Sequence, residues 1–387
     1  MIYRDFGKTG LKVSSLGYGA NYPPTKDEQV LDMPHPSTVN EKKQIELFLK
    51  AAGSGVNYFD TCEFYRKGQS EEILGKAIKK IGRKKVILST KIPVDPAMGG
   101  CGDSGRVWTK KLHGQLKRIK TGYIDVHHFH DLRWEEYTKF LDGRKGPLHA
   151  AQKARKDGHI RHISFSTHDH PCNISKLIRT GEFESMLVYH NLLYRLNETV
   201  IKEAHQKGLG VAVMGPTVGG RLLFKPGLDI KNKQKRARHV FRFVFADPNI
   251  DIILSGMNTS NIIDENVAFS AQRQPLSPKE KKIIENIYNE VKGLKEIYCI
   301  GCGYCLPCPK GVDIPSAFFL MNILKIFPHQ KQWSIGQFEK IRQRKASPDQ
   351  CIACGQCVKK CPQELQIPEH LAEIGTEFTM LTKNEHG

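Results

Sequence analysis

The chain has 387 residues, and its 59 Lys and Arg exceed its 40 Asp and Glu, which gives a formal net charge of +19. This length suits one large domain followed by a small one. No apolar run approaches the ~20 residues that a membrane-spanning helix needs, so we expect no membrane partner. The first residues are polar and show no signal-peptide pattern, which favours a reducing cytoplasm.

The positive charge raises the question of a nucleic-acid partner. Its densest run covers residues 231–238, KNKQKRAR. No helix-turn-helix, zinc finger or aromatic–basic RNA pattern accompanies this run. We favour the solvated start of a helix over the alternative of a phosphate-contacting loop, and we expect no nucleic-acid partner.

The first predicted element is a hairpin at residues 3–12, with Gly7 and Gly10 at its turn. Eight short apolar runs follow as candidate strands: residues 13–19, 56–60, 86–90, 124–129, 160–166, 186–189, 210–214 and 250–255. Helical patterns such as residues 41–52, 71–81 and 198–207 alternate with them. This alternation predicts a (β/α)8 TIM barrel over residues 1–275, because an open doubly wound sheet would usually show a glycine-rich turn after its first strand.

A break in composition at residues 274–278, QPLSP, predicts a domain boundary. Beyond it, helical patterns cover residues 279–293, 314–327 and 335–344. We therefore expect a small, mainly helical second domain at residues 276–387.

Two cysteine arrays in this second domain place a thiol at almost every third residue and end in a proline. They are Cys299, Cys302, Cys305 and Cys308 before Pro309, and Cys351, Cys354, Cys357 and Cys361 before Pro362. In ferredoxin-type spacing, three cysteines of each run bind one cluster and the fourth binds the other, so we expect two [4Fe–4S] clusters. Two four-cysteine zinc sites are the alternative, but they leave the triple spacing and both prolines unexplained.

Active sites of TIM barrels lie where strands end and the following loops begin. Asp60, Tyr65, Lys91 and His130 stand at such places. A carbonyl that accepts a hydride needs a proton at its oxygen, and a nearby Lys⁺ lowers the pKa of a tyrosine. These four residues are therefore catalytic candidates: Tyr65 as the acid, Lys91 as its charged neighbour, Asp60 as the partner of Lys91, and His130 as a hydrogen-bonding group for the substrate oxygen.

Residues 1–270 resemble the aldo-keto reductase family, and the whole chain resembles its subgroup with a C-terminal two-[4Fe–4S] ferredoxin-type domain. The matching segments are residues 3–14 (YRDFGKTGLKVS), 55–61 (GVNYFDT), 70–75 (SEEILG) and 158–166 (GHIRHISFS). The family's catalytic Asp, Tyr, Lys and His fall on the four candidates above. The resemblance implies NADP or NAD as the cofactor, bound across the barrel mouth.

The resemblance also implies which residues hold that cofactor. They are Ser166, Asn191, Met214, Gly215, Ser255, Gly256, Met257, Glu265 and Asn266. Ser166 matches a contact to the nicotinamide amide and Met214 the residue that stacks on its ring. Thr167 and Leu187 stand where the family usually has Asn and Gln. No Lys or Arg lies between Ser255 and Asn266, where NADPH-specific members often bind the 2′-phosphate, so strict NADPH preference is not implied.

Three functions compete on these patterns. The first is NAD(P)H-dependent reduction of an aldehyde, ketone or sugar, or oxidation of the corresponding alcohol. The second is an electron-transfer protein whose clusters serve a redox partner, with the barrel as a platform. The third is a nucleic-acid- or oxygen-responsive regulator. The substrate itself is not encoded in a readable motif, although the segments 22–38 and 97–105 are expected to shape its pocket.

Overall fold

The computed structural model describes residues 1–21, 39–141, 143, 145–223, 230–291, 299, 304–326, 331–361 and 363–383. These residues form two compact units. The first contains the described residues within 1–21, 39–217 and 237–281, and the second contains 218–223, 230–236 and the described residues from 282 onward. The domain boundary that we predicted after residue 275 stays a prediction. The segment 22–38, expected to shape the substrate pocket, lies outside the description.

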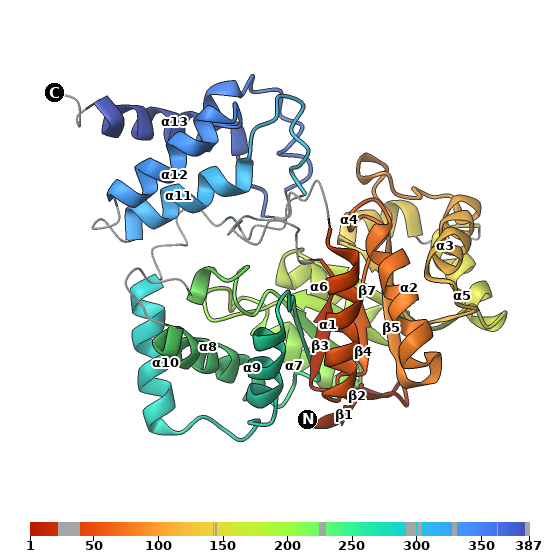
Figure 1. The fold of residues 1–387 in the computed structure, drawn as a ribbon. Coiled ribbons are helices and arrows are strands. Elements are labelled where there is room, and N and C mark those ends of the chain that lie inside the picture. The colour runs from red at the N-terminus through yellow and green to blue at the C-terminus, as the bar shows by residue number, and fades with distance from the viewer. Residues whose placement is uncertain are drawn as a thin grey trace. The chain divides into compact units, whose positions relative to one another are not determined.

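Within the described residues, eight parallel strands close a barrel in the first unit (Figure 1), which confirms the predicted fold. The order around the barrel is β10-β3-β4-β5-β6-β7-β8-β9. The strands are β3 Leu16–Gly19, β4 Tyr58–Asp60, β5 Ile87–Pro93, β6 Ile124–His130, β7 Ile160–Thr167, β8 Ser185–Tyr189, β9 Gly210–Met214 and β10 Ile252–Ser255. The predicted hairpin is also present, since β1 Tyr3–Asp5 pairs antiparallel with β2 Lys12–Ser14.

Helices lie around the outside of the barrel (Figure 1). They are α1 Glu41–Gly53, α2 Gln69–Ile81, α3 Gly105–Ile119, the short α4 Trp134–Glu136, α5 Pro147–Lys156, α6 Pro171–Arg179, α7 Glu198–Lys207 and α9 Ser260–Ser270. Side chains satisfy backbone N–H groups at several helix starts: Asn40 accepts from Lys43 N, and Thr259 accepts from Ile262 N. Gly208 ends α7 in the left-handed conformation that glycine adopts without strain.

The interior of the barrel is apolar at the end where the strands begin. The buried members of this cluster are Phe6, Val13, Tyr58, Val126, Leu187, Ala212, Ile252 and Leu254. Phe6 and Val13 belong to the hairpin segment, and Lys8 N donates to Gly208 O just before β9, so the hairpin closes this end. Because side chains alternate between the two faces of a strand, Ile87, Ser89 and Lys91 share the inner face of β5.

The second unit has a helical core of its own, which confirms the mainly helical expectation. Its helices include α11 Ile314–Ile326, α12 Lys331–Gln343 and α13 Ile367–Lys383. Phe338 and Phe378 stack with ring centroids 4.2 Å apart at the α12–α13 contact. The prediction missed α13, although Leu371, Ile374 and Phe378 have helical spacing and are buried. It also began α12 four residues late.

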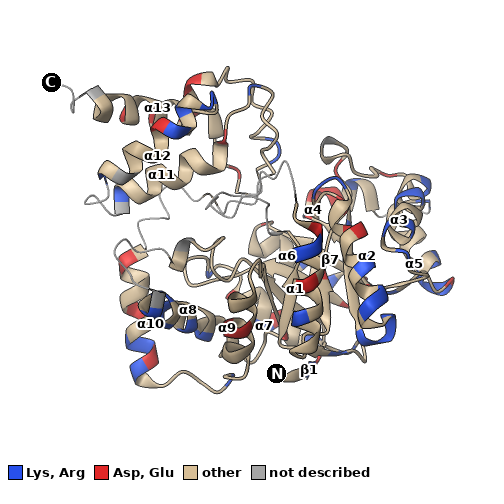
Figure 2. Ribbon diagram, viewed as in Figure 1, with Lys and Arg blue, Asp and Glu red and all other residues tan. Residues whose placement is uncertain are grey.

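Charged side chains are distributed over several elements. Lys and Arg occur on α2, on α8 Ile230–Phe245 and on α10 Pro278–Val291, with Asp and Glu among them on α10 (Figure 2). Residues 231–235 at the start of α8 are exposed, as expected of a solvated helix start, whereas Arg236 is buried and pairs with Glu290 at 2.8 Å. Among the helices that the structure describes, none is long and apolar enough to cross a membrane.

Helix α2 packs so closely on the end of α3 that its central glycine has no room for a side chain. A β-carbon at Gly75 would lie 2.3 Å from the backbone oxygen of Ile119, whereas one at Gly53 would meet nothing within 4 Å. We expect Gly75→Ala to destabilise the fold by ~1–3 kcal/mol, because backbone must move to relieve the overlap. The urea midpoint of the first unit measures this.

Gly53→Ala is the matched control, since it adds the same methyl group to a helix without an overlap. Its urea midpoint should stay near that of the wild type. Equal midpoints for the two variants would contradict the close packing of α2 on α3.

Candidate active site and cluster-binding region

The four catalytic candidates come from neighbouring strands that end at the same side of the barrel. Asp60 is the last residue of β4, Lys91 lies near the end of β5, and His130 is the last residue of β6. Tyr65 follows β4 in a turn where Arg66, Lys67 and Gly68 all have positive φ. Because parallel strands present their carboxyl ends at one face, the sequence brings these side chains to the barrel mouth.

Lys91 is the centre of the site. Its Nζ lies 2.5 Å from Asp60 Oδ2, 2.8 Å from Thr61 O and 3.5 Å from the Tyr65 hydroxyl. Lys91 and Asp60 are almost completely buried, with side-chain exposures of 1% and 3%. Burial raises the pKa of Asp60, while Lys91 and Ser89 act in the opposite direction. The structure therefore brings Asp60, Lys91 and Tyr65 together as a buried ion pair that touches a phenol.

His130 joins this group through a buried thiol. Its Nδ1 lies 3.4 Å from Cys62 Sγ, and Cys62 Sγ lies 3.7 Å from Lys91 O. Burial, reinforced by Lys91, lowers the pKa of His130 to about 3, so the ring is neutral near pH 7. A neutral imidazole has one N–H, and its neighbour decides which nitrogen carries it. The sequence analysis did not identify this contact.

A second buried carboxylate, that of Glu71, supports β5, the strand that carries Lys91, from outside the barrel. Glu71 accepts from Thr90 Oγ1 at 2.7 Å and from Arg118 Nε at 2.6 Å. Gln115 Nε2 donates to Lys91 O at 2.8 Å. These contacts attach α2 and α3 to β5 at Thr90 and at Lys91 itself. They belong to the rigid surroundings that keep a catalytic group in place.

Asp60 has polar neighbours deeper in the barrel as well. Ser89 Oγ donates to Asp60 Oδ1 at 2.8 Å, and His128 Nε2 lies 2.9 Å from Ser89 Oγ. His128 is fully buried. Its link to Asp60 was missed, although the signal is in the sequence: positions two before Lys91 and two before His130 lie on the same faces of β5 and β6.

The proposed nicotinamide contacts also lie at strand ends or in the elements that follow. Ser166 Oγ accepts from Asp131 N at 3.0 Å, next to His130. Asn191 Nδ2 donates to Gly215 O at 3.1 Å, after the end of β9. Gly215 has a φ of +69°, and a β-carbon there would lie 2.1 Å from the ring of Tyr189. Met214 is partly buried at the end of β9.

The remaining cofactor candidates connect β10 to α9. Asn266 Nδ2 donates to Ser255 Oγ at 3.0 Å, while Met257 O accepts from the Tyr18 hydroxyl. Gly256 is exposed between two buried neighbours, and Glu265 is partly buried on α9. The start of α9 offers backbone N–H groups, which suit a phosphate. Lys50 adds a cation there: its Nζ lies 2.5 Å from Ser260 Oγ and 2.6 Å from Asp264 Oδ2.

The loop after β6 holds a buried histidine–carboxylate contact that the sequence analysis did not identify. His168 Nδ1 lies 2.9 Å from Asp131 Oδ1, and both residues are almost fully buried. Although burial alone would raise it, His168 and His130 lower the pKa of Asp131 to about 2. His168 therefore fixes the loop that carries the backbone N–H bonded to Ser166.

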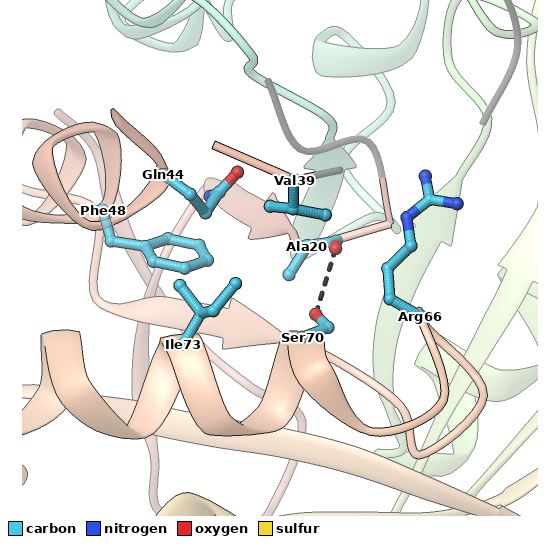
Figure 3. A pocket seen from close by; sticks show the side chains of 7 residues that line it. All are labelled: Ala20, Val39, Gln44, Phe48, Arg66, Ser70 and Ile73. Carbon is cyan, nitrogen blue, oxygen red and sulfur yellow. Dashed lines mark hydrogen bonds between the residues drawn. The ribbon is translucent and has the colours of Figure 1, made fainter. Parts of the chain in front are cut away.

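A small pocket lies behind the Tyr65 turn, between α1, α2 and the end of β3 (Figure 3). Its lining is made of Ala20, Val39, Gln44, Phe48, Arg66, Ser70 and Ile73. Ser70 Oγ donates to Ala20 O at 3.1 Å and lies 2.9 Å from Thr61 Oγ1. These bonds attach the start of α2 to β3 and to the residue after Asp60. The pocket therefore belongs to the framework of the turn that carries Tyr65.

The cysteine arrays lie against the helical core of the second unit. Of their eight members, six are partly buried against it: Cys299, Cys305, Cys308, Cys351, Cys357 and Cys361. Cys354 is exposed, and Cys302 and Pro362 lie outside the described residues. Ala353 N lies 3.4 Å from Cys351 Sγ, the kind of backbone contact that stabilises a thiolate. Over the described ranges, no group of three His, Cys, Asp or Glu side chains is arranged to hold a single metal ion.

The two arrays also come together. Burial raises the pKa of Cys357, and the thiols of Cys351, Cys308 and Cys354 raise it further. Cys308 belongs to the first array, so its thiol lies within electrostatic range of the second. This is the arrangement that ferredoxin-type ligation requires, in which the fourth cysteine of one run serves the other cluster. The donor set fits iron–sulfur clusters by this test.

Comparison with known proteins agrees with this geometry. Residues 15–241, more than half of the chain, match the Aldo/keto reductase family, and residues 298–366 match the 4Fe-4S dicluster domain. The chain is 30% identical over 260 residues to "Aldo-keto reductase AMT2" of Alternaria alternata, which covers 58% of this chain and 67% of that protein.

Two further relatives extend over most of their own length. "L-galactose dehydrogenase" of Arabidopsis thaliana is 25% identical over 326 residues, which is 75% of this chain and 95% of that protein. The solved structure of "aldo-keto reductase AKR11C1 from Bacillus halodurans (holo form)" superimposes with a TM-score of 0.59 at 21% identity, covering 74% of this chain and 96% of that one. This structural likeness supports the fold alone. The chain therefore belongs to the aldo/keto reductase family, and its sequence continues into a 4Fe-4S dicluster domain.

Proposed function

We propose that this oxidoreductase uses NADPH or NADH to reduce a small carbonyl substrate, or catalyses the reverse oxidation of an alcohol. The observation that carries the proposal is the buried Asp60–Lys91 pair with Lys91 Nζ 3.5 Å from the Tyr65 hydroxyl. A lysine that is held charged beside a phenol makes the phenol a better proton donor. The four catalytic candidates together favour an enzyme over a barrel that serves only as a platform for the clusters.

The chemistry divides between the bound cofactor and the side chains. The nicotinamide, when bound, supplies a hydride to the carbonyl carbon. Tyr65 Oη donates its proton to the carbonyl oxygen, Lys91 stabilises the tyrosinate that remains, and solvent returns a proton to Tyr65. Neutral His130 orients the carbonyl by a hydrogen bond to the same oxygen. Since one relative bears the name of a sugar dehydrogenase, sugars belong in the substrate panel beside aldehydes and ketones.

We further propose that the cofactor contacts are Ser166, Asn191, Met214, Gly215 and the residues from Ser255 to Asn266 named above. We assign the barrel to residues 1–275 and the cluster domain, with two [4Fe–4S] clusters, to residues 276–387. A reducing, cytoplasmic compartment suits such clusters. An electron-transfer role for the clusters is the second candidate, favoured by the exposure of Cys354 and of Ile352 beside it.

Tyr65→Phe should reduce the turnover of NAD(P)H-dependent carbonyl reduction by at least ~100-fold, the usual contribution of a positioned general acid. Phenylalanine keeps the ring but removes the proton donor. Nicotinamide binding, measured by fluorescence titration, should stay near the wild-type value. Lys91→Met should also be severe, because the tyrosinate loses its counter-charge. Near-wild-type turnover of Tyr65→Phe would identify another group as the acid.

Anaerobically purified protein should be brown and contain about eight irons per chain, the content of two four-iron clusters. Cys308→Ser should lower the iron content, because this thiol ligates a cluster. Cys172→Ser is the matched control, since Cys172 is an exposed thiol outside both arrays and its loss should leave the iron unchanged. Stoichiometric zinc with negligible iron, after expression with adequate iron, would contradict the cluster assignment.

The cluster domain should take no part in the hydride step. A hydride carries two electrons, whereas each cluster accepts one, so direct exchange between nicotinamide and cluster is unfavourable without a flavin. Single-turnover hydride transfer with saturating substrate should proceed at equal rates in the wild type and in folded Cys354→Ser. If the variant binds cofactor and substrate normally but its hydride step fails, the division of labour is wrong.

A further inference from the structure

The inner face of the barrel carries a line of polar residues directly beneath the catalytic pair. Ser89 lies two residues before Lys91 on β5, and His128 lies two residues before His130 on β6. His128, Ser89, Asp60 and Lys91 follow one another at separations of 2.9, 2.8 and 2.5 Å. Both Ser89 and His128 have no exposed surface. The layer below them is the apolar cluster that contains Tyr58 and Val126.

The direction of these hydrogen bonds follows from the chemistry of the groups. An ionised carboxylate only accepts, so the single hydroxyl hydrogen of Ser89 points to Asp60 Oδ1. Ser89 Oγ must then accept from His128, which requires a hydrogen on Nε2 of that ring. Burial lowers the pKa of His128 well below its ordinary value, so the ring is neutral and its single N–H suffices. The remaining oxygen of Asp60 is left to face Lys91.

On the basis of the proposed function, we propose that Ser89 and His128 are positioning residues of the reductase. Together they orient Asp60 and keep it ionised, so that Lys91 stays charged beside Tyr65. Neither residue touches the substrate or the cofactor in this scheme. Both act through Asp60. The contribution is specific to this pair of side chains, because the buried oxygen Oδ1 of Asp60 has Ser89 as its side-chain donor.

The sign of the expected pH effect follows from the hydrogen bond. A donor to a carboxylate favours its ionised form and lowers its pKa, so removing the Ser89 hydroxyl raises the pKa of Asp60. Activity that requires ionised Asp60 is then lost at a higher pH as the solution is acidified. The other titratable groups around the Asp60–Lys91 pair are Tyr58, Cys62, Tyr65, His128 and His130. All five remain in Ser89→Ala.

The test compares Ser89→Ala with Ser164→Ala in the full-length holoprotein. Ser164 pairs with His128 in the strand register and is equally buried, but its hydroxyl donates to Ser185 O. Ser89→Ala should move the acidic limb of the kcat profile up by about one pH unit, the effect of one charge-assisted hydrogen bond. Its KM should change little, and Ser164→Ala should retain the wild-type profile. Identical profiles for the two variants overturn the inference.

A double-mutant cycle separates a connected chain from two independent structural roles. His128→Leu should shift the acidic limb in the same direction but by less, because Ser89 keeps its hydroxyl. In the Ser89→Ala background, the same substitution should add no further shift. Shifts that simply add would overturn the connection between the two residues.

A measurement without turnover keeps this inference distinct from the proposed function. With aspartate labelled at ¹³Cγ, the resonance of Asp60, assigned from Asp60→Asn, should titrate at a higher pH in Ser89→Ala than in wild-type protein. An unchanged titration overturns the positioning role, whether or not the protein reduces carbonyls. A shifted titration in a protein that reduces no member of the substrate panel supports the role for Ser89 and overturns the proposed function instead.

Discussion

The burial of Asp60 against Lys91 is the interaction on which the rest of the site depends. Two opposite charges that are removed from water are stable only when they lie close together and when their remaining donors and acceptors form hydrogen bonds. Lys91 meets this demand with the backbone oxygen of Thr61, and Asp60 with the hydroxyl of Ser89. The outer shell of Glu71, Thr90 and Gln115 then attaches α2 and α3 to the same strand. The position of Tyr65 is a consequence of this packing.

Much of this arrangement could be predicted because it depends on local patterns. The alternation of strands and helices indicated the barrel, and strand ends indicated Asp60, Lys91 and His130. The bonds of Cys62 to His130 and of Lys50 to α9 could not be predicted in this way, because they join residues 68 and 210 positions apart. Strand registers decide such contacts. His128 is an intermediate case. Its place on the inner face of β6 can be predicted from that of His130, two residues later. Its contact with Ser89 cannot, because that contact depends on how β5 lies beside β6.

The two halves of the sequence pose different physical problems. The barrel buries charged groups inside a closed sheet whose neighbouring strands are hydrogen-bonded to one another. The second unit has a smaller core of three helices, against which six cysteines lie partly buried. Small cores of this kind are commonly reinforced by bound metal. An iron–sulfur assembly would thus contribute to the folding of the second unit in addition to any redox role.

The apolar layer beneath the polar line has a kinetic consequence. Phe6, Tyr58 and Val126 fill the barrel below Asp60, and the hairpin closes that end. In the proposed reaction, the proton that Tyr65 gives away therefore has to be replaced from the mouth, through which substrate and product also pass. Tyr65 would then be reprotonated only after the product has left. A solvent isotope effect would therefore appear in the steps that follow product release as well as in the chemical step.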